Sequence, residues 1–295
     1  MATKLYDLTN VNSPSETYAE IIKTLSLIDP NHDTSILKKV YADIIRLFTG
    51  KYPGYRASNT KYHNLAHTCG VTLATVRLIH GLHLQGHKLS SRLVELGLIS
   101  ALFHDTGLIQ TVEEQEGTGA QYTIGHEERS IDLMGKYLGA NGFSAEDLTD
   151  CRHIIMCTIL TLPVAAIPFR SDGIRTMGKI LGSADLIAQM ADRSYLEKLP
   201  LLFLEFEEAK VPGFETPLEL FKNTEEFYHS VARTRLLEEM GNVASAAQFH
   251  FKERWLIDRD LYADAITNNI NYLKKIYEDC AENFDFLLTK IRRKI

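Results

Sequence analysis

The stretch SRLVELGLISALFHDTG, residues 91–107, has the apolar periodicity of a helix and ends on an adjacent histidine and aspartate. Its large apolar residues recur at helical spacing, at Leu93, Leu96, Ile99 and Leu102. Ser90 or Ser91 can cap the first turn, and Gly107 with the preceding threonine disfavours continuation beyond Asp105. We therefore expect His104 and Asp105 at the end of an apolar helix, at the edge of a core.

The same periodicity covers most of the chain, whereas alternating strand patterns closed by Asn-Gly or Asp-Gly turns are scarce. The fold is therefore predicted to be all-α. The expected helices cover residues 15–27, 34–48, 62–80, 90–105, 148–160, 173–192, 193–208, 217–240 and 254 to the C-terminus, with a further helix beginning near 125. No internal repeat or low-complexity linker divides them, which favours a single helical domain over residues 1–295.

Composition and charge exclude several classes of function. A net charge of −6 and a pI near 6.0 argue against a general nucleic-acid binder, which needs a basic surface to displace counterions. The N-terminal residues have neither the basic nor the apolar part of a signal peptide, so a cytoplasmic location is expected. The most apolar stretch, residues 154–169, is too short for a membrane span and contains two prolines, so no membrane role is expected.

Four side chains suited to metal binding occur in apolar surroundings. His67 follows His63 by four residues in the segment YHNLAH, on one helix face, although such pairs are more often solvated or hydrogen-bonded than ligated. The adjacent His104 and Asp105 make metal binding more favoured, because an ionised aspartate at the edge of a core needs a cation or hydrogen bonds. Asp185, in the apolar segment ILGSADLI, needs a partner for the same reason, with an arginine or a helix cap as the alternative.

These residues resemble the metal ligands of the HD superfamily of metal-dependent phosphohydrolases. Ligands there follow the order His, His-Asp, Asp, and the same order is present here in His67, His104-Asp105 and Asp185. The segment HNLAH, residues 63–67, is also similar to a signature of the cyclic-nucleotide phosphodiesterases, a branch of that superfamily.

The resemblance implies a helical bundle with a divalent metal ion at its centre, which agrees with the all-α prediction. It places the HD core at about residues 60–190, with extra N-terminal helices (1–59) and C-terminal helices (191–295) packed on it. The identity of the ion stays open among Mn, Mg, Fe, Co, Ni and Zn.

The number of metal ions also stays open. Binuclear members of the superfamily have two further histidines between the His-Asp pair and the final aspartate, for which His126 and His153 are the candidates, although Thr158 could occupy the second place. With two ions, the resemblance implies that Asp105 bridges them.

His63 is expected either to protonate the leaving ester oxygen, as in phosphodiesterases, or to act as a hydrogen-bonding residue behind the ligands.

The resemblance implies hydrolysis of a phosphate ester by a metal-bound hydroxide, with a nucleotide or a related small phosphorylated metabolite as substrate. His63 and Asp105 are the expected catalytic residues. Arg129 and Lys61 are candidate phosphate contacts, against a default of surface solvation for each. The alternatives are a di-iron oxygenase of HD type, which requires both additional histidines, and a non-catalytic nucleotide-binding sensor. A homo-oligomer is an open possibility.

A second run of histidines, His80, His83 and His87, is not expected to bind metal. Gly81 and Gly86 are expected to break the helix that would align them, which favours a solvated loop. His250 lies outside any recognised group of ligands.

Overall fold

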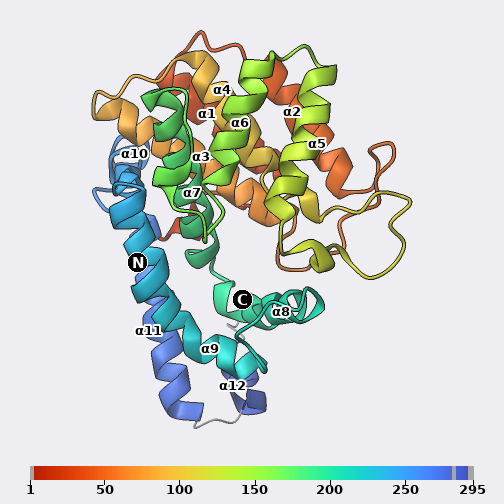
Figure 1. The fold of residues 1–295 in the computed structure, drawn as a ribbon. Coiled ribbons are helices and arrows are strands. Elements are labelled where there is room, and N and C mark those ends of the chain that lie inside the picture. Colours follow the sequence, from red (N-terminus) through yellow and green to blue (C-terminus); the bar gives the residue numbers. More distant parts are fainter. Residues whose placement is uncertain (1–2, 281–283, 292–295) are drawn as a thin grey trace.

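The computed structural model describes residues 3–280 and 284–291 and confirms the all-α prediction (Figure 1). Within these residues there is no strand, and the extended segments form only the isolated bridges Thr49–Ala57 and Tyr55–Thr111. No helix among them is long and apolar enough to cross a membrane.

Most of the helices form a bundle around α3 (Leu65–Leu84), which is the central element of the molecule. Its residues from Thr68 to Leu82 are almost all buried, as expected for a helix that is covered on every side. The helices that pack against it are α1 (Pro14–Ile28), α4 (Ser91–Phe103), α7 (Asp172–Met190) and α10 (Ala247–Trp255). Helices from both ends of the chain therefore cover the helix that contains His67.

The remaining helices complete the bundle and an extension below it in Figure 1. In the bundle these are α2 (Ser35–Phe48), α5 (His126–Ala140) and α6 (Ala145–Met156). The extension consists of α8 (Tyr195–Glu208), α9 (Pro217–Glu226), α11 (Leu261–Cys280) and α12 (Phe284–Ile291). Short 3-10 turns include η1 (Leu5–Asp7), η2 (Thr106–Leu108), η3 (Gly119–Tyr122), η4 (Val164–Ala166) and η7 (Val243–Ala246).

Helix caps place the residues of interest at defined positions. Asn64 begins α3, where its side-chain oxygen accepts hydrogen bonds from the backbone nitrogens of Ala66 and His67. Ser90 caps α4 in the same way through the backbone nitrogen of Leu93. Helix α4 ends at Phe103, so its C-cap is His104, as the sequence predicted to within two residues.

The prediction that Gly81 breaks a helix was wrong, and so was the solvated loop expected at His80. Helix α3 continues through Gly81 to Leu84, because the glycine packs against the backbone of η7: a Cβ there would lie 1.9 Å from the oxygen of Ala246. His80 is buried, and its Nδ1 lies 3.1 Å from Nδ1 of His250. The glycine serves close packing here and not a turn.

The C-terminal third is more interrupted than its periodicity predicted. The helix expected over 217–240 is α-helical only to Glu226 and continues as two π-helical segments, η5 (Phe227–Ala232) and η6 (Arg235–Glu239). The helix expected from 254 onward is interrupted at Leu256, whose φ of 57° is left-handed. Residues 281–283 and 292–295 of that expected helix lie outside the described part of the chain.

Helix α6 ends at Met156 and not near residue 160, and Arg235 binds the segment that follows it. Its buried guanidinium donates hydrogen bonds to the carbonyl oxygens of Cys157, Ile159, Leu160 and Leu162. These hydrogen bonds satisfy buried or partly buried carbonyl groups that no helix pairs. One side chain from the C-terminal third thus determines the path of the chain after α6.

Candidate metal centre

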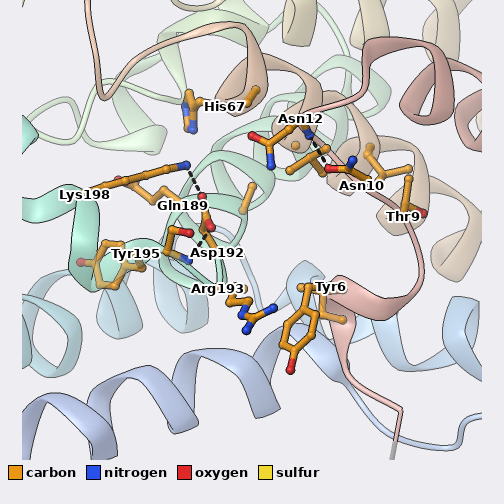
Figure 2. Close-up of a pocket in the computed structure, with 18 of the residues that line it drawn as sticks. Tyr6, Thr9, Asn10, Asn12, His67, Gln189, Asp192, Arg193, Tyr195 and Lys198 are labelled. Carbon is orange, nitrogen blue, oxygen red and sulfur yellow. Dashed lines mark hydrogen bonds and ion pairs between the residues drawn. The ribbon is translucent and has the colours of Figure 1, made fainter. Parts of the chain in front are cut away.

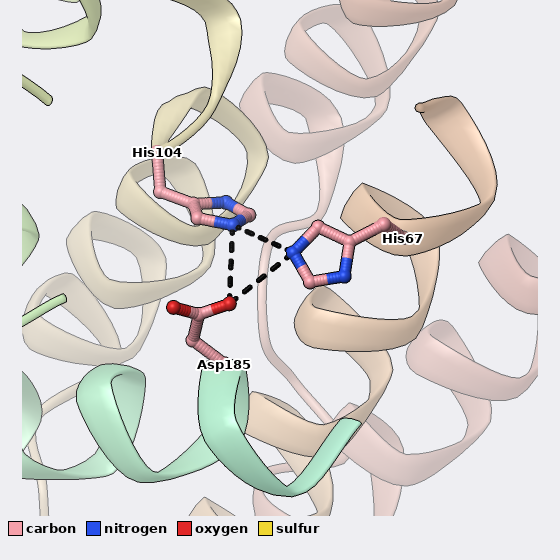
Figure 3. Close-up of side chains that lie close together, drawn as sticks. All are labelled: His67, His104 and Asp185. Atoms are coloured by element: carbon pink, nitrogen blue, oxygen red, sulfur yellow. Dashed lines mark hydrogen bonds and ion pairs between the residues drawn. The ribbon is translucent and has the colours of Figure 1, made fainter. Parts of the chain in front are cut away.

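Three residues from different helices converge on one point inside the bundle (Figure 3). His67 lies in the first turn of α3, His104 follows α4, and Asp185 lies on α7. The Nε2 atoms of the two histidines are 3.3 Å apart, and Oδ1 of Asp185 lies 3.2 Å from Nε2 of His67 and 3.6 Å from that of His104. The predicted convergence of these residues is confirmed, and the cluster could hold a metal ion.

Asp105 lies between this cluster and a further histidine. Its Oδ2 is 3.3 Å from Nε2 of His67 and 3.2 Å from Nε2 of His104, whereas its Oδ1 is 3.3 Å from Nε2 of His126. Although Oδ2 is buried and close to two imidazoles, its geometry gives it no hydrogen bond. A buried carboxylate oxygen of this kind is suited to a cation.

Backbone carbonyl groups orient two of the histidines toward the centre. Nδ1 of His104 lies 2.8 Å from the carbonyl oxygen of Ala101, and Nδ1 of His126 lies 2.8 Å from that of Thr123. Since a carbonyl oxygen only accepts, each Nδ1 must donate its proton there. In the neutral imidazoles the unprotonated Nε2 then faces the carboxylates, which is the orientation that a metal ligand needs.

Close packing places His126 beside Asp105. Gly107, in the turn that follows Asp105, packs against the first turn of α5, where a Cβ would lie 2.0 Å from the carbonyl oxygen of His126. The backbone nitrogen of Gly107 also donates a hydrogen bond to Oγ of Ser130 at 2.8 Å. A side chain at position 107 would therefore displace the start of α5.

The electrostatics of the cluster favour a positive charge at its centre. Burial disfavours the charged form of His126, but its hydrogen bond to Asp105 and the charge of that carboxylate raise the pKa to about 9. For His104 burial lowers the pKa, but Asp105 and Asp185 together hold it well above its usual value. Conversely, burial alone would raise the pKa of Asp105, but His104, His126 and His67 together hold it well below its usual range. Protons or a metal cation can satisfy these carboxylates.

The donor set fits a divalent cation. Imidazole nitrogens bind first-row transition metals well, and carboxylate oxygens add the negative charge that compensates the ion. His67, His104 and Asp185 would hold such an ion, with Oδ2 of Asp105 directed to the same point. These donors do not determine the identity of the metal.

The two predicted ligands of a second ion have different positions. His126 is adjacent to Asp105, but no contact joins His153 to the cluster among the described residues. The ring of His153 packs against Phe169 at 6.2 Å, and its buried Nδ1 has no hydrogen-bond partner. Thr158 lines the cavity beside Asp105 instead. The structure thus places His153 against Phe169, because α6 directs this face there and not toward the centre, and its ligand role stays a prediction without a contact that supports it.

Sequence reasoning missed Glu205 of α8, which lies beside the cluster. Its Oε2 accepts a hydrogen bond from Nδ1 of His63 at 2.7 Å, and its Oε1 accepts one from the backbone nitrogen of Tyr62 at 2.7 Å. The carboxylate is almost fully buried. A glutamate between Leu204 and Phe206 was the available signal, but nothing local indicates which histidine it contacts.

A cavity of about 520 Å³ opens at the cluster, between the bundle and the extension. His63, Asp105, His126 and Asp185 lie at one end of it. Apolar side chains of α8, α9 and the neighbouring segments form most of the remaining wall: Leu199, Leu202, Phe206, Phe214, Leu220 and Phe227. Among the described residues, no lysine or arginine lines this cavity.

The two predicted phosphate contacts do not reach the cavity. Arg129 is held by the protein itself, because its Nε donates to the carbonyl oxygen of Gly107 at 2.8 Å and its guanidinium pairs with Glu114 and stacks on the ring of Tyr122. Lys61 is exposed to solvent and is not part of the cavity wall. Adjacency in sequence to a ligand thus did not place either side chain in the cavity wall, and the phosphate-binding roles of both stay predictions.

The fold and the site define an all-helical protein with a buried histidine and aspartate cluster that could hold a metal ion. The chain belongs to the Npun_R2479-like family, whose model matches residues 29–248. A comparison with curated proteins gives no match. The matched residues include every member of the cluster and also Glu205.

Proposed function

We propose that the protein is a metal-dependent phosphohydrolase that cleaves a phosphate ester of a small metabolite. The observation that supports this most is the position of Asp105, whose two oxygens face different imidazoles next to the His63–Glu205 pair. A divalent cation supplies the chemistry needed, since it makes water a nucleophile near neutral pH and neutralises charge that develops on phosphoryl oxygens.

The residues of the chain have separate roles in this proposal. His67, His104 and Asp185 hold the cation. Asp105 directs one carboxylate oxygen toward this cluster and the other toward His126. His63 lies at the cavity end with its Nδ1 proton committed to Glu205, so its Nε2 is free to carry a proton to the leaving oxygen. Glu205 orients the ring, as a buried carboxylate does for a catalytic histidine in other hydrolases.

The composition of the cavity favours a substrate with one phosphate and a large apolar group. A nucleoside polyphosphate has several negative charges, and cationic side chains that would bind them are absent from the described wall. Glu127 and Glu128 at the rim would repel such a substrate. Nucleotides thus remain within the proposed class, but an aryl or alkyl phosphate monoester or diester fits the wall better.

The oxygenase alternative loses support because it requires His153 as a ligand. A non-catalytic sensor would not need the buried His63–Glu205 pair. These arguments favour hydrolysis over both alternatives.

The decisive experiment measures ester hydrolysis by the full chain loaded in turn with Mn, Mg, Fe, Co, Ni or Zn, as phosphate released from the monoesters and nucleotides and as phenol released from the diester. Phenyl phosphate, octyl phosphate, bis-phenyl phosphate, AMP and ATP form the substrate panel. We expect metal-dependent turnover that is highest on the apolar esters, and its loss in Asp105→Asn together with most of the bound metal. His153→Gln is the matched control and should retain metal and activity. Oxygen consumption by the iron form without phosphate release would overturn the proposal, as would ligand binding without turnover for every ester.

A further inference from the structure

A second cavity, of about 340 Å³, borders His67 of the metal cluster (Figure 2). Its wall consists of the N-terminal segment around Tyr6 to Asn12, one face of α3, and the turn between α7 and α8. His67 is the only member of the metal cluster that lines it, so a molecule bound there would not reach Asp105 or His126. This cavity is therefore separate from the one in which we place the reaction.

Arg77 of α3 lines this cavity and is a buried cation without an anionic partner. Its side chain is 2% exposed, and its guanidinium hydrogen-bonds only hydroxyl groups, those of Tyr262 at 3.2 Å and Thr9 at 3.1 Å. Its Nε has no hydrogen-bond partner, and no carboxylate of the described residues forms an ion pair with it. The rings of Phe251 and Tyr262 lie 5.5 and 5.9 Å away, near the limit of a cation–π contact.

A second arginine, Arg193, contributes to the same cavity. Its guanidinium stacks on the ring of Tyr6 at 4.6 Å, as Figure 2 shows, and it too has no ion pair among the described residues. The neighbouring Lys198 differs, because it is neutralised by Asp192. Two of the three basic residues in the wall therefore form no ion pair among the described residues, and of these Arg77 is the buried one.

A buried charge is costly unless an opposite charge or a full set of hydrogen bonds compensates it. Hydroxyl groups satisfy only part of the guanidinium of Arg77, and the aromatic rings add a weak attraction. An anion in the cavity would supply the missing charge, and arginine binds carboxylate and phosphate groups through paired hydrogen bonds. The apolar part of the wall, which includes Leu5, Val11 and Leu73, suits an apolar body, and the carboxylates of Asp192 and Glu197 line another part of it.

We propose that this cavity binds a small organic anion, with a carboxylate or phosphate head at Arg77 and an apolar body against the N-terminal segment. Such a ligand would act as an effector, because the wall between the cavities is shared. Gln189 and Tyr195 line both cavities, and Oε1 of Gln189 accepts a hydrogen bond from the hydroxyl of Tyr62 at 3.0 Å. Tyr62 precedes His63, so occupancy of the second cavity can be transmitted to the reaction site.

Calorimetric titration of the full chain with phenylphosphonate and with benzoate tests the proposal and separates the two head groups. Benzyl alcohol is the neutral control. The titrations use the Asp105→Asn background, which is expected to lose most of its bound metal. Anions that would bind at the metal centre then do not contribute to the measured heat. We expect saturable binding of at least one anion and none of benzyl alcohol. Arg77→Met should weaken that binding at least tenfold, whereas Arg233→Met, at an exposed arginine, should not change it.

The melting temperature separates a ligand anchor from a structural cation. Arg77→Met keeps the apolar stem and removes the uncompensated charge, so we expect it to melt no lower than the parent protein. Arg193→Gln, at a half-buried position, is the second variant and should weaken anion binding several-fold. Absence of binding of both anions would overturn the proposal, as would unchanged binding in Arg193→Gln combined with unfolding of Arg77→Met. No outcome depends on turnover, so failure of the phosphohydrolase proposal would not affect this test.

Discussion

Nδ1 of His63 donates a hydrogen bond to Oε2 of Glu205 at 2.7 Å, although 142 residues separate them along the chain. The contact joins the start of α3 in the bundle to α8 in the extension. It fixes the ring of His63 at the end of the reaction cavity and leaves Nε2 as its only free nitrogen. In the proposed reaction this atom protonates the leaving group.

The first prediction concerns that proton. His63→Gln should lower kcat for octyl phosphate by about 100-fold or more, because an alkoxide is a poor leaving group that needs a general acid. The same variant should lower kcat for 4-nitrophenyl phosphate by less than about 10-fold, because nitrophenolate leaves without protonation. Glu205→Gln should show the same pattern with a smaller effect. Equal losses on the two esters would contradict an acid role, and bound metal measured in parallel is the control.

The second prediction concerns the pH dependence of metal binding. Asp105 raises the pKa of His126 to about 9 and holds that of His104 well above its usual value, so both imidazoles of the metal-free protein carry protons near neutral pH. A cation must displace protons, so metal affinity should rise as pH increases from about 6 toward 9. Titration calorimetry in two buffers of different ionisation enthalpy measures the protons released. Affinity that is independent of pH would contradict the prediction.

The third prediction concerns His80 and His250, which are buried against each other. Burial lowers the pKa of His80 to about 4 and that of His250 to about 2, with Arg77 contributing to the latter. Because the unfolded chain takes up these protons near pH 6.5 and the folded protein does not, stability should fall as pH decreases below that value. We expect a loss of roughly 1–3 kcal/mol between pH 6.5 and 5 from urea titrations.

A double variant tests the assignment of that loss to this pair. His80→Gln with His250→Leu removes both titrating groups and should flatten the stability profile between pH 6.5 and 5. His229→Gln, at an exposed position, is the matched control and should keep the wild-type slope. A control variant with an equally flat profile would show that other groups cause the acid sensitivity.

The fourth prediction compares two glycines. Gly107→Ala introduces a Cβ 2.0 Å from the carbonyl oxygen of His126 and should lower the free energy of unfolding by about 1–3 kcal/mol. It should also weaken metal binding, because it displaces the start of α5. Gly135→Ala lies within α5, where an added Cβ would have no atom within 4 Å, and it should stabilise the protein by about 0.4–1 kcal/mol. Chemical denaturation and metal titration of both variants check the pair, and a stable Gly107→Ala with normal metal affinity would contradict the packing argument.

The sequence predicted the local features of the fold correctly. Helix α4 and its end at His104 follow from apolar spacing, a serine cap and the Thr106-Gly107 step, all within 20 residues. Errors arose where tertiary contacts override local preference. Gly81 stays in α3 because η7 packs onto it, and the segment where α6 was expected to continue is instead held by hydrogen bonds from Arg235 to its carbonyls.

By itself the sequence determined the helical class and the candidate ligands His67, His104, Asp105 and Asp185, because helix periodicity and the adjacency of two side chains are local properties. Only the tertiary structure decided which further residues join them. His126 and Glu205 reach the centre, whereas His153 and Arg129 turn to other partners. Helix packing sets these directions, and it depends on contacts between residues far apart in the chain, which no local pattern encodes.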